Sequence, residues 1–367
     1  MTGVQTCALP ILLMKKRKLL GLILSVVMVV TMLGGCGGAS NNKTSSGDGG
    51  SGDGNDLITV GFSQVGAESD WRTANTESMK STFTEANGYR LIFDDAQQKQ
   101  ENQLKAIRNF IQQEVDYIVL APVTESGWDA VLKEAKDADI PVIIVDRMVD
   151  VSDDSLYTAW VGSNFKLEGQ KACAWLKAYQ DAKKIDKINI VDIQGTIGAS
   201  AQIGRTEALN EAVKANGWNL LAQQTGEFTQ AKGQEVMESM LKQYKDINVV
   251  YCENDNEAFG AIDAIEAAGK TVGPDGDILV MSFDTTKAGI TDTQSGKIIL
   301  NTECNPLHGP RVEEIIKTLE SGGTPEKKAY VEEGVFAHGD EVPSVTVDDQ
   351  KYDVTKVTKE VVAGRAY

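Results

Sequence analysis

The sequence has few of the residues that metal centres and disulfide frameworks need. Its 367 residues include 2 histidines, His308 and His338, and 5 cysteines, none of them in a CxxC pair. Cys173, Cys252 and Cys304 each stand in an apolar stretch, and free cysteine is among the residue types most often buried. We therefore expect three buried thiols, with no metal site and no cofactor.

Positive charge is also scarce. The chain has 36 lysines and arginines against 53 aspartates and glutamates, which gives a formal net charge of -17 and a pI near 4.7. Nucleic-acid binding needs a face rich in lysine or arginine, and the acids are spread thinly along the chain. This balance disfavours a nucleic-acid partner and indicates a solvated acidic surface.

The common catalytic motifs are missing. The sequence holds no GxSxG elbow, no HExxH and no Walker phosphate loop, and the glycines of GTIGASAQIG, residues 195–204, do not follow the spacing of a dinucleotide fingerprint. Paired carboxylates could in principle perform acid–base hydrolysis of a glycoside, but little else in the sequence supports an enzyme. We predict a protein without catalytic activity.

The first part of the chain has the order of an export signal. MKKRKLLGLILSVVMVVTMLGGC, residues 14–36, runs from basic residues through an apolar stretch to small residues and a cysteine. The basic start, modest apolar length and small-residue end favour a signal peptide over a membrane-spanning helix. Residues 33–36, LGGC, resemble the lipobox of bacterial lipoproteins, so we assign residues 1–36 to the signal and expect Cys36 to be lipidated. Residues 1–13 fit no part of a signal, and we interpret them as a misassigned start or a sequence artefact.

The segment after Cys36 predicts a tether. Residues 37–56, GGASNNKTSSGDGGSGDGND, contain almost nothing to bury and are typical of a flexible linker. A lipid anchor followed by a spacer places the folded part outside the cytoplasmic membrane, attached to it through the lipid.

From residue 57 onward, strand-like runs alternate with amphipathic helical patterns. The first series of runs lies at residues 58–64, 90–95, 117–122 and 142–147. The second series lies at residues 188–195, 220–226, 249–255 and 278–284, with a further run at 298–304. Apolar strands joined by amphipathic helices require parallel sheets covered on both faces. The pattern therefore predicts an α/β protein with two doubly wound parallel-sheet lobes.

Polar residues stand where strands of both series end. Asp146 and Arg147 close a run of the first series, and Asn254, Asp255 and Asp284 close runs of the second. Ligands of open α/β sheets bind beyond the carboxyl ends of the strands, so these side chains would converge on one cleft. Helix capping is the alternative for any single one of them, but their recurrence in both lobes favours a ligand.

The residue types in this cleft suit a sugar. Carboxylates accept hydrogen bonds from hydroxyls, arginine donates to sugar oxygens, and an aromatic ring covers C–H groups. Trp71 and Arg72 follow the first strand in a polar loop, where a tryptophan is less easily buried in the core. The sequence thus predicts a binding site for a monosaccharide.

Four long stretches carry a resemblance to a known family. They are GFSQVGAESDWRTA at 61–74, DDAQQKQENQLKAIRNFI at 94–111, APVTESGWDAVLKEAKDADIPVIIVDR at 121–147 and QGTIGASAQIGRTEAL at 194–209. Over roughly residues 57–340 the chain resembles the periplasmic binding proteins of ribose and galactose type, the sugar receptors of bacterial ABC importers, and looks most like the galactofuranose-binding type. The resemblance implies the type I fold, a monomer, galactofuranose as the leading ligand and delivery to the permease subunits of an ABC transporter.

The resemblance also implies site residues. Trp71 and Arg72 would close over the sugar from the first lobe, while Asp146 and Arg147 would bind its hydroxyls. From the second lobe Arg205 would reach in, Phe228 would stack on the ring, and Asn254 and Asp284 would bind hydroxyls. Gln64 and Ser69 are weaker candidates. Ala121 and Cys304 stand where ribose receptors carry amides that bind the sugar, which disfavours ribose.

The family's chain crosses between its lobes three times, and the crossings would fall near Gly162–Ser163, near Thr302–Glu303 and after about residue 334. This predicts a first lobe of residues 57–162 and 304–334 and a second lobe of residues 163–303 and 335–367, which close around the ligand. Two rivals share the fold. A sugar-responsive repressor is disfavoured by the lipobox and by the missing helix-turn-helix, whereas a sensor that presents its ligand-bound form to a membrane signalling receptor stays open beside import.

Overall fold

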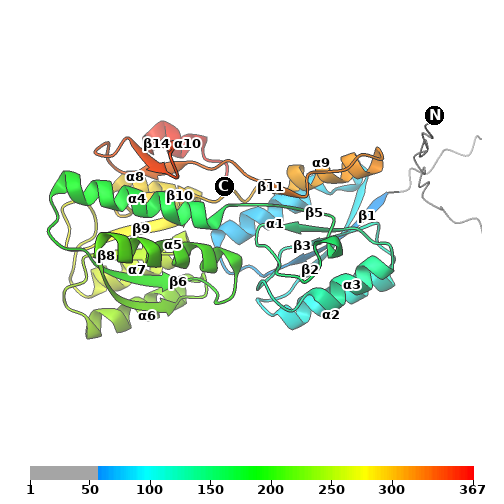
Figure 1. Ribbon diagram of the computed structural model, residues 1–367, viewed down its shortest axis with the longest axis horizontal. Helices are drawn as coiled ribbons and strands as arrows, with labels where there is room; N and C mark the ends of the chain where they lie inside the picture. Colours follow the sequence, from blue (N-terminus) through cyan, green and yellow to red (C-terminus); the bar gives the residue numbers. More distant parts are fainter. Residues whose placement is uncertain (1–56) are drawn as a thin grey trace, which may run out of the picture. The chain divides into compact units, whose positions relative to one another are not determined.

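The structure, a computed structural model, describes residues 57–367, which form two α/β lobes (Figure 1). The predicted signal, Cys36 and the predicted linker lie outside the described residues. Within residues 57–367, no helix combines the length and the apolar character needed to cross a membrane.

The first lobe is built on a six-stranded parallel sheet with the order β11-β5-β4-β3-β1-β2. Its strands are β1 Ile58–Gln64, β2 Tyr89–Asp95, β3 Tyr117–Leu120, β4 Val142–Val145, β5 Ala159–Gly162 and β11 Lys328–Tyr330. Its helices are α1 Asp70–Thr82, α2 Gln100–Gln112, α3 Asp129–Asp137 and α9 Gly309–Glu320, with short 3-10 turns η1 Glu85–Asn87 and η2 Asp154–Leu156. Although α9 comes late in the chain, it packs beside α1 (Figure 1).

Alternate residues of one strand show that this sheet is covered on both faces. Ile118 and Leu120 of β3 pack in the core that α2 and α3 cover, whereas Tyr117 and Val119 pack in the core under α1 and α9. Successive side chains of a strand point to opposite faces, so a strand buried on both faces must be apolar throughout. This is why the continuous apolar run predicted a doubly wound sheet.

The second lobe is built on an eight-stranded sheet with the order β13-β14-β12-β10-β9-β8-β6-β7. Its strands are β6 Asn189–Gln194, β7 Asn219–Thr225, β8 Val249–Cys252, β9 Leu279–Asp284, β10 Leu300–Glu303, β12 Val335–Ala337, β13 Ser344–Val347 and β14 Gln350–Lys356. Its helices are α4 Phe165–Lys183, α5 Ser200–Asn216, α6 Gln230–Gln243, α7 Asp255–Ala267, α8 Lys287–Ser295 and α10 Lys359–Gly364. The strands β6 to β10 are parallel, whereas β12 is antiparallel to β10 and β13 is antiparallel to β14. The sheet is therefore mixed at this edge.

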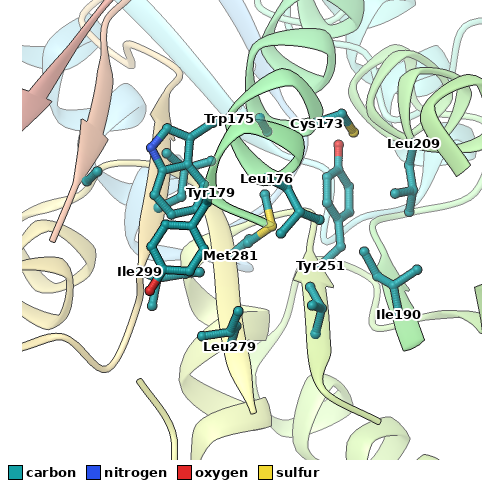
Figure 2. Close-up of a cluster of buried hydrophobic side chains, with 14 of the residues drawn as sticks. Cys173, Trp175, Leu176, Tyr179, Ile190, Leu209, Tyr251, Leu279, Met281 and Ile299 are labelled. Atoms are coloured by element: carbon teal, nitrogen blue, oxygen red, sulfur yellow. The ribbon is translucent and has the colours of Figure 1, made fainter. Parts of the chain in front are cut away.

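The larger core of the second lobe lies between α4, α5 and the sheet (Figure 2). Trp175 and Tyr179 of α4 stack with their ring centroids 4.6 Å apart. Tyr251 of β8 and Met281 of β9 belong to the same core. The Tyr251 hydroxyl donates a hydrogen bond of 3.1 Å to the backbone oxygen of Arg205. This bond ties the helix that carries Arg205 to the core.

The backbone passes between the two sheets at three places. Residues 163–164 join β5 to α4, residues 304–308 join β10 to α9, and residues 331–334 join β11 to β12. At the first crossing, a Cβ atom on Gly162 would lie 2.2 Å from the backbone oxygen of Asp146. Only glycine therefore allows the first crossing to pass so close to the end of β4.

Candidate ligand-binding cleft

Strand ends and helix starts of both lobes surround a small cavity of about 20 Å³. The residues that line it are Glu68, Ser69, Trp71, Arg72, Asp146, Arg147, Phe165, Ala201, Arg205, Phe228, Asn254, Asp284 and Cys304. This space holds about one water molecule, so a sugar would have to enter with the lobes apart and the lining side chains displaced. A larger hollow of about 550 Å³ beside Asp70, Lys287 and Tyr367 opens to the surface. Buried charged side chains converge on the smaller cavity and not on this larger hollow. We therefore place the site in the smaller cavity.

The two lobes contact each other around the cavity. The backbone nitrogen of Met148 donates to Ser200 Oγ at 2.9 Å, and that of Asp70 donates to Asn256 Oδ1 at 3.0 Å. The indole nitrogen of Trp71 donates to the backbone oxygen of Cys304 at 2.6 Å. These bonds hold the lobes in a closed arrangement.

Arg72 is the centre of the charged wall of the first lobe. Its Nη2 donates to Asp146 Oδ2 at 2.8 Å, its Nε to Glu68 Oε1 at 3.0 Å and its Nη1 to Gln64 Oε1 at 3.2 Å. Burial alone would lower the pKa of Arg72, but the charges of Asp146 and Glu68 outweigh burial and raise it. The guanidinium is thus a fixed positive charge, and its partners hold it in one orientation.

Arg147 adds a second buried guanidinium. Its Nη1 donates to the backbone oxygen of Val123 at 3.0 Å, its Nη2 lies 3.7 Å from Glu68 Oε1, and its guanidinium carbon lies 5.0 Å from the ring centroid of Phe228. Burial and the nearby charge of Arg72 lower the pKa of Arg147 to about 10. Arg147 therefore stays protonated at neutral pH and can donate further hydrogen bonds into the cavity.

The strand-end aspartates share an unusual backbone. Asp146 follows β4 with a φ of 62°, and Asp284 ends β9 with a φ of 98°. Non-glycine residues in this region are strained by about 1 to 3 kcal/mol, and such strain clusters at functional sites. Neither aspartate caps a helix, since the N-cap of the helix after β9 is Thr286. The capping alternative is therefore wrong for these two residues.

Asn254 behaves differently, because it is the N-cap of α7. Its Oδ1 accepts from the backbone nitrogen of Glu257 at 2.8 Å, and its Nδ2 donates to the backbone oxygen of Phe228 at 3.1 Å. Capping is thus correct for Asn254, which also holds the backbone of Phe228 against the cavity.

Arg205 supplies the positive charge of the second lobe. Its Nε and Nη2 donate to Glu168 Oε2 at 2.9 and 2.8 Å, its Nη1 donates to the backbone oxygen of Glu253, and its Nη2 lies 3.6 Å from Asp284 Oδ1. Burial would lower the pKa of Arg205, but the charge of Glu168 outweighs burial and raises it. Burial raises the pKa of Asp284 in spite of Arg205.

Asp284 and Glu68 are the acids of the cavity that have oxygens left for a ligand. Asp284 is 4% exposed, and Arg205 Nη2 lies 3.6 Å from its Oδ1, while Glu68 Oε2 is buried without a hydrogen-bond partner in the described part of the chain. Asp146, by contrast, already accepts a bond from Arg72. Because a buried carboxylate without donors is unfavourable, a hydroxyl that donates to Asp284 would stabilise the complex.

The lining of the cavity also has an apolar part. Trp71, Phe165, Ala201, Phe228 and Cys304 belong to one cluster of buried side chains. Apolar and aromatic surfaces pack against C–H groups. The guanidinium carbons of Arg72 and Arg147 lie 4.6 and 5.0 Å from the ring centroids of Trp71 and Phe228. The cavity therefore combines charged hydrogen-bonding groups with aromatic surfaces that lie beside them.

Phe228 is held in place by two neighbours that are distant in the sequence. A Cβ atom on Gly195 would lie 1.9 Å from Phe228 Cζ, so the ring occupies the space that the glycine leaves free. The backbone nitrogen of Phe228, at a φ of 62°, donates to the buried Glu257 Oε1 at 2.9 Å. The ring thus faces the cavity because Gly195 and Glu257 hold it there.

The predicted ligand residues come together, with two exceptions. All of the residues implied as ligand-binding except Gln64 line the cavity, whereas Asp255, also expected in the cleft, does not line it and accepts hydrogen bonds from Ser282, Thr286 and Asn301. Gln64 is fully buried behind Arg72, where it accepts from Arg72 and donates to Asn75 and Thr76. Its position is that of a support for Arg72. Whether each lining residue binds a ligand stays a prediction.

Sequence reasoning missed Glu68, Phe165 and Ala201 as lining residues. Glu68 could have been found, because it stands four residues before Arg72 and pairs with it. The Phe165 and Ala201 positions carry no local signal, since they depend on how α4 and α5 approach the cleft. The three cysteines are free and buried, although Cys304 lies on the cavity wall and not in a lobe core.

One group within residues 57–367 brings metal-ligating atoms close together. Atoms of Glu168, Cys304 and Glu333 lie within 4.8 Å of one another. Arg205 already binds Glu168, and Lys171 Nζ donates to the backbone oxygen of Glu333 at 3.1 Å. These two positive charges oppose a divalent ion, so we assign no metal to the group.

Comparison with known proteins agrees with this geometry. Residues 60–300 match the model of the family described as "Periplasmic binding protein domain". The chain is 44% identical over 275 residues to the galactofuranose-binding protein YtfQ of Escherichia coli, with 74% of this chain and 85% of that protein covered.

Two solved structures are similar over most of their length. One is a Mycobacterium smegmatis protein in complex with β-D-fucofuranose, with 43% identity, a TM-score of 0.74 and coverage of 78% of this chain and 93% of that one. The other is the periplasmic binding component of the arabinose ABC transporter of Shewanella, bound to L-arabinofuranose, with 41% identity, a TM-score of 0.72 and coverage of 77% and 93%. The matched family and the relatives from Escherichia coli and Shewanella are binding proteins, which confirms the prediction that the chain is not an enzyme. The resemblance and the two-lobed α/β fold predicted from the sequence are confirmed as well: the chain belongs to the periplasmic binding protein family.

Proposed function

We propose that this protein captures a monosaccharide in its furanose form between the two lobes, with galactofuranose as the leading ligand. The observation that carries the proposal is the lining of the cavity, in which buried aspartates and arginines lie beside a cluster of aromatic side chains. The relatives support the furanose form, since their names or bound ligands are galactofuranose, fucofuranose and arabinofuranose.

The side chains divide the recognition of a sugar between them. Asp146 and Asp284 accept hydrogen bonds from hydroxyls, and Arg72, Arg147 and Arg205 donate to hydroxyl and ring oxygens. The rings of Trp71 and Phe228 cover the C–H faces. A hydrogen bond to a charged group contributes about 1.5 to 3 kcal/mol, so each such bond to a sugar hydroxyl would change the Kd by about one to two orders of magnitude.

We further propose that the protein works outside the cytoplasmic membrane, held there by a lipid on Cys36, and passes its sugar to the permease subunits of an ABC transporter. Family membership supports the extracytoplasmic location and the transporter. In the alternative function, the ligand-bound form is presented to a membrane signalling receptor. Fractionation of cells that express Cys36→Ser tests the anchor, because unchanged membrane association with normal processing would contradict it.

A thermal-shift panel on the purified protein tests ligand capture. Galactose, fucose, arabinose, ribose, fructose and glucose are compared, together with a methyl galactofuranoside that cannot change its ring form. A ligand that binds only the folded state at about 100 times its Kd stabilises by about 2.7 kcal/mol. We expect the largest shift with the galactofuranoside. No shift with any furanose-forming sugar, beside a clear shift with glucose, would overturn the proposal.

A further inference from the structure

One carboxylate touches all three crossings between the lobes. Glu333 belongs to the third crossing, residues 331–334, and its Oε1 accepts from Ser163 Oγ of the first crossing at 2.6 Å. The same oxygen accepts from the backbone nitrogen of Asn305, in the second crossing, at 2.7 Å. Lys171 Nζ also donates to its backbone oxygen. Any rotation of the lobes about the crossings must therefore change the surroundings of Glu333.

A buried carboxylate of α4 faces the half-buried Glu333. Glu168 is 1% exposed and gives its Oε2 to Arg205. Its Oε1 is buried, and no donor in the described part of the chain reaches it, although oxygens of the two carboxylates lie within 4.8 Å of each other. Two carboxylates at this separation repel each other when both are ionised, and a proton between them turns the repulsion into a hydrogen bond.

We propose that Glu168 and Glu333 share one proton in the closed arrangement, and that ligand binding is therefore coupled to proton uptake at the hinge. This inference rests on the proposed function, because it requires a ligand that closes the lobes. When the lobes open, the crossings twist and water reaches Glu333, so that the two acids separate and the proton is released.

The charges around the pair decide how strongly the proton is held. The groups that face the two acids are Arg205, Lys171, Cys304, Glu303 and, beyond Arg205, Asp284, while Arg365 and Tyr367 hold Glu303 from its other side. Burial, followed by the charge of Glu168, raises the pKa of Glu333. Burial also raises the pKa of Glu168, in spite of Arg205. Burial and the acid–acid repulsion therefore outweigh the two cations.

The same contacts connect the pair to the ligand. Arg205 and Cys304 both line the cavity, Arg205 binds Glu168 directly, and Cys304 Sγ lies 3.3 Å from Ser163 Oγ. A sugar that hydrogen-bonds to Arg205 thus acts on the pair through one side chain.

The sign of the pH dependence follows from the raised pKa in the closed state. The closed form is favoured while the pair is protonated, and this advantage is lost as pH rises from the pKa of the open form towards that of the closed form. One proton taken up per ligand changes the binding constant by up to about tenfold per pH unit in that window. Affinity therefore falls as pH rises.

Calorimetric titration of the full chain with the galactofuranoside tests this coupling. Titrations in two buffers of different ionisation enthalpy, repeated between about pH 5 and pH 8, count the protons taken up. We expect wild type to take up protons on binding, with the number per sugar rising to about one inside the window. Glu333→Gln should lack this uptake. Its affinity should be nearly independent of pH, because its amide can donate to Glu168 without titrating. Glu332→Gln, which removes the same charge from the exposed neighbour, should behave as wild type.

The proton counts of wild type and Glu333→Gln decide whether the two acids share a proton. A wild-type protein that binds the sugar without proton uptake at any pH overturns the inference and leaves the proposed function standing, whatever Glu333→Gln does. Equal proton counts for wild type and Glu333→Gln also overturn it. Stoichiometric Zn²⁺ binding that Glu333→Gln abolishes would overturn it too, because a metal ion would then hold the place of the proton. If no sugar binds, the proposed function fails and the coupling fails with it.

Discussion

Replacing Asp284 by asparagine separates ligand binding from stability. Asp284 lines the cavity, its side chain is nearly fully buried, and burial raises its pKa. An ionised carboxylate in this position is destabilising in the absence of a ligand and becomes useful only when a hydroxyl donates to it. Asparagine keeps the shape, and it tolerates the φ of 98° better than most residues do.

Two magnitudes follow for Asp284→Asn. A hydrogen bond to a charged group contributes about 1.5 to 3 kcal/mol and a neutral one about 0.5 to 1.5 kcal/mol. The amide oxygen still accepts, so the loss in binding should be about 1 to 2 kcal/mol, which corresponds to roughly 5- to 30-fold in Kd. The unfolding free energy should stay the same or increase, because the substitution removes a buried charge.

The pH dependence gives this prediction a second test. A carboxyl group with a raised folded-state pKa contributes stability below its unfolded pKa, about 3.9, and this contribution is lost as pH rises through the folded-state pKa. The stability gained by Asp284→Asn should therefore grow from acid to neutral pH. Urea unfolding at several pH values measures the stability, and calorimetry with the galactofuranoside measures the affinity.

Asp146→Asn is the matched control, because Asp146 stands at the corresponding strand end but forms a 2.8 Å ion pair with Arg72. Removing one partner of a buried pair costs about 3 to 5 kcal/mol, so this variant should lose stability as well as affinity. The reasoning is refuted if Asp284→Asn destabilises the protein by a similar amount, which would make Asp284 chiefly a partner of Arg205. Unchanged affinity would remove Asp284 from the site.

Three further changes test other parts of the structure. Gly195→Ala should weaken sugar binding at least about tenfold, since its methyl group displaces the ring of Phe228; Gly364→Ala, where a Cβ meets nothing within 4 Å, should leave calorimetric affinity unchanged. Trp71→Phe loses the indole hydrogen bond to the backbone oxygen of Cys304 in the second crossing and should raise Kd by about three- to tenfold, with a smaller effect in urea unfolding. Burial lowers the pKa of His308 to about 4, whereas an unperturbed histidine has a pKa of about 6.5. The folded state therefore has its full stability above about pH 6.5, where His308 is neutral in the folded and the unfolded chain. That stability should fall by up to about 1.4 kcal/mol per pH unit towards pH 4, and a flat profile would contradict this.

The sequence predicts those parts of the fold that local pattern determines. Val142–Val145 is apolar at every position, because both faces of its sheet are covered, and such a run can be recognised without a structure. The strand β14, Gln350–Lys356, is largely exposed and polar, so its pairing with β12 leaves no apolar run to find. The mixed edge of the second sheet was missed for this reason. In the first sheet, β5, Ala159–Gly162, was missed because its apolar run ends at Gly162 after three residues.

The site divides in a similar way. Asp146 and Asp284 could be predicted because a residue's place at a strand end is a property of the local sequence. The pairing of Asp146 with Arg72 could not be predicted, because these residues stand 74 positions apart. Residue types and spacing indicate where a side chain stands on its element. Only the packing of the lobes determines what it meets.

Backbone strain links the lobe cores to the cleft. Asp146, Phe228 and Asp284 line the cavity with φ values of 62°, 62° and 98°, and each such residue costs about 1 to 3 kcal/mol. The backbone nitrogen of Asp146 is held by a 2.9 Å bond to Val161 in β5, and that of Phe228 is held by Glu257. Strained residues keep their conformation only where the surrounding structure is rigid. The same strain directs two carboxylates and an aromatic ring into one cavity before the ligand arrives, so less ordering is required on binding.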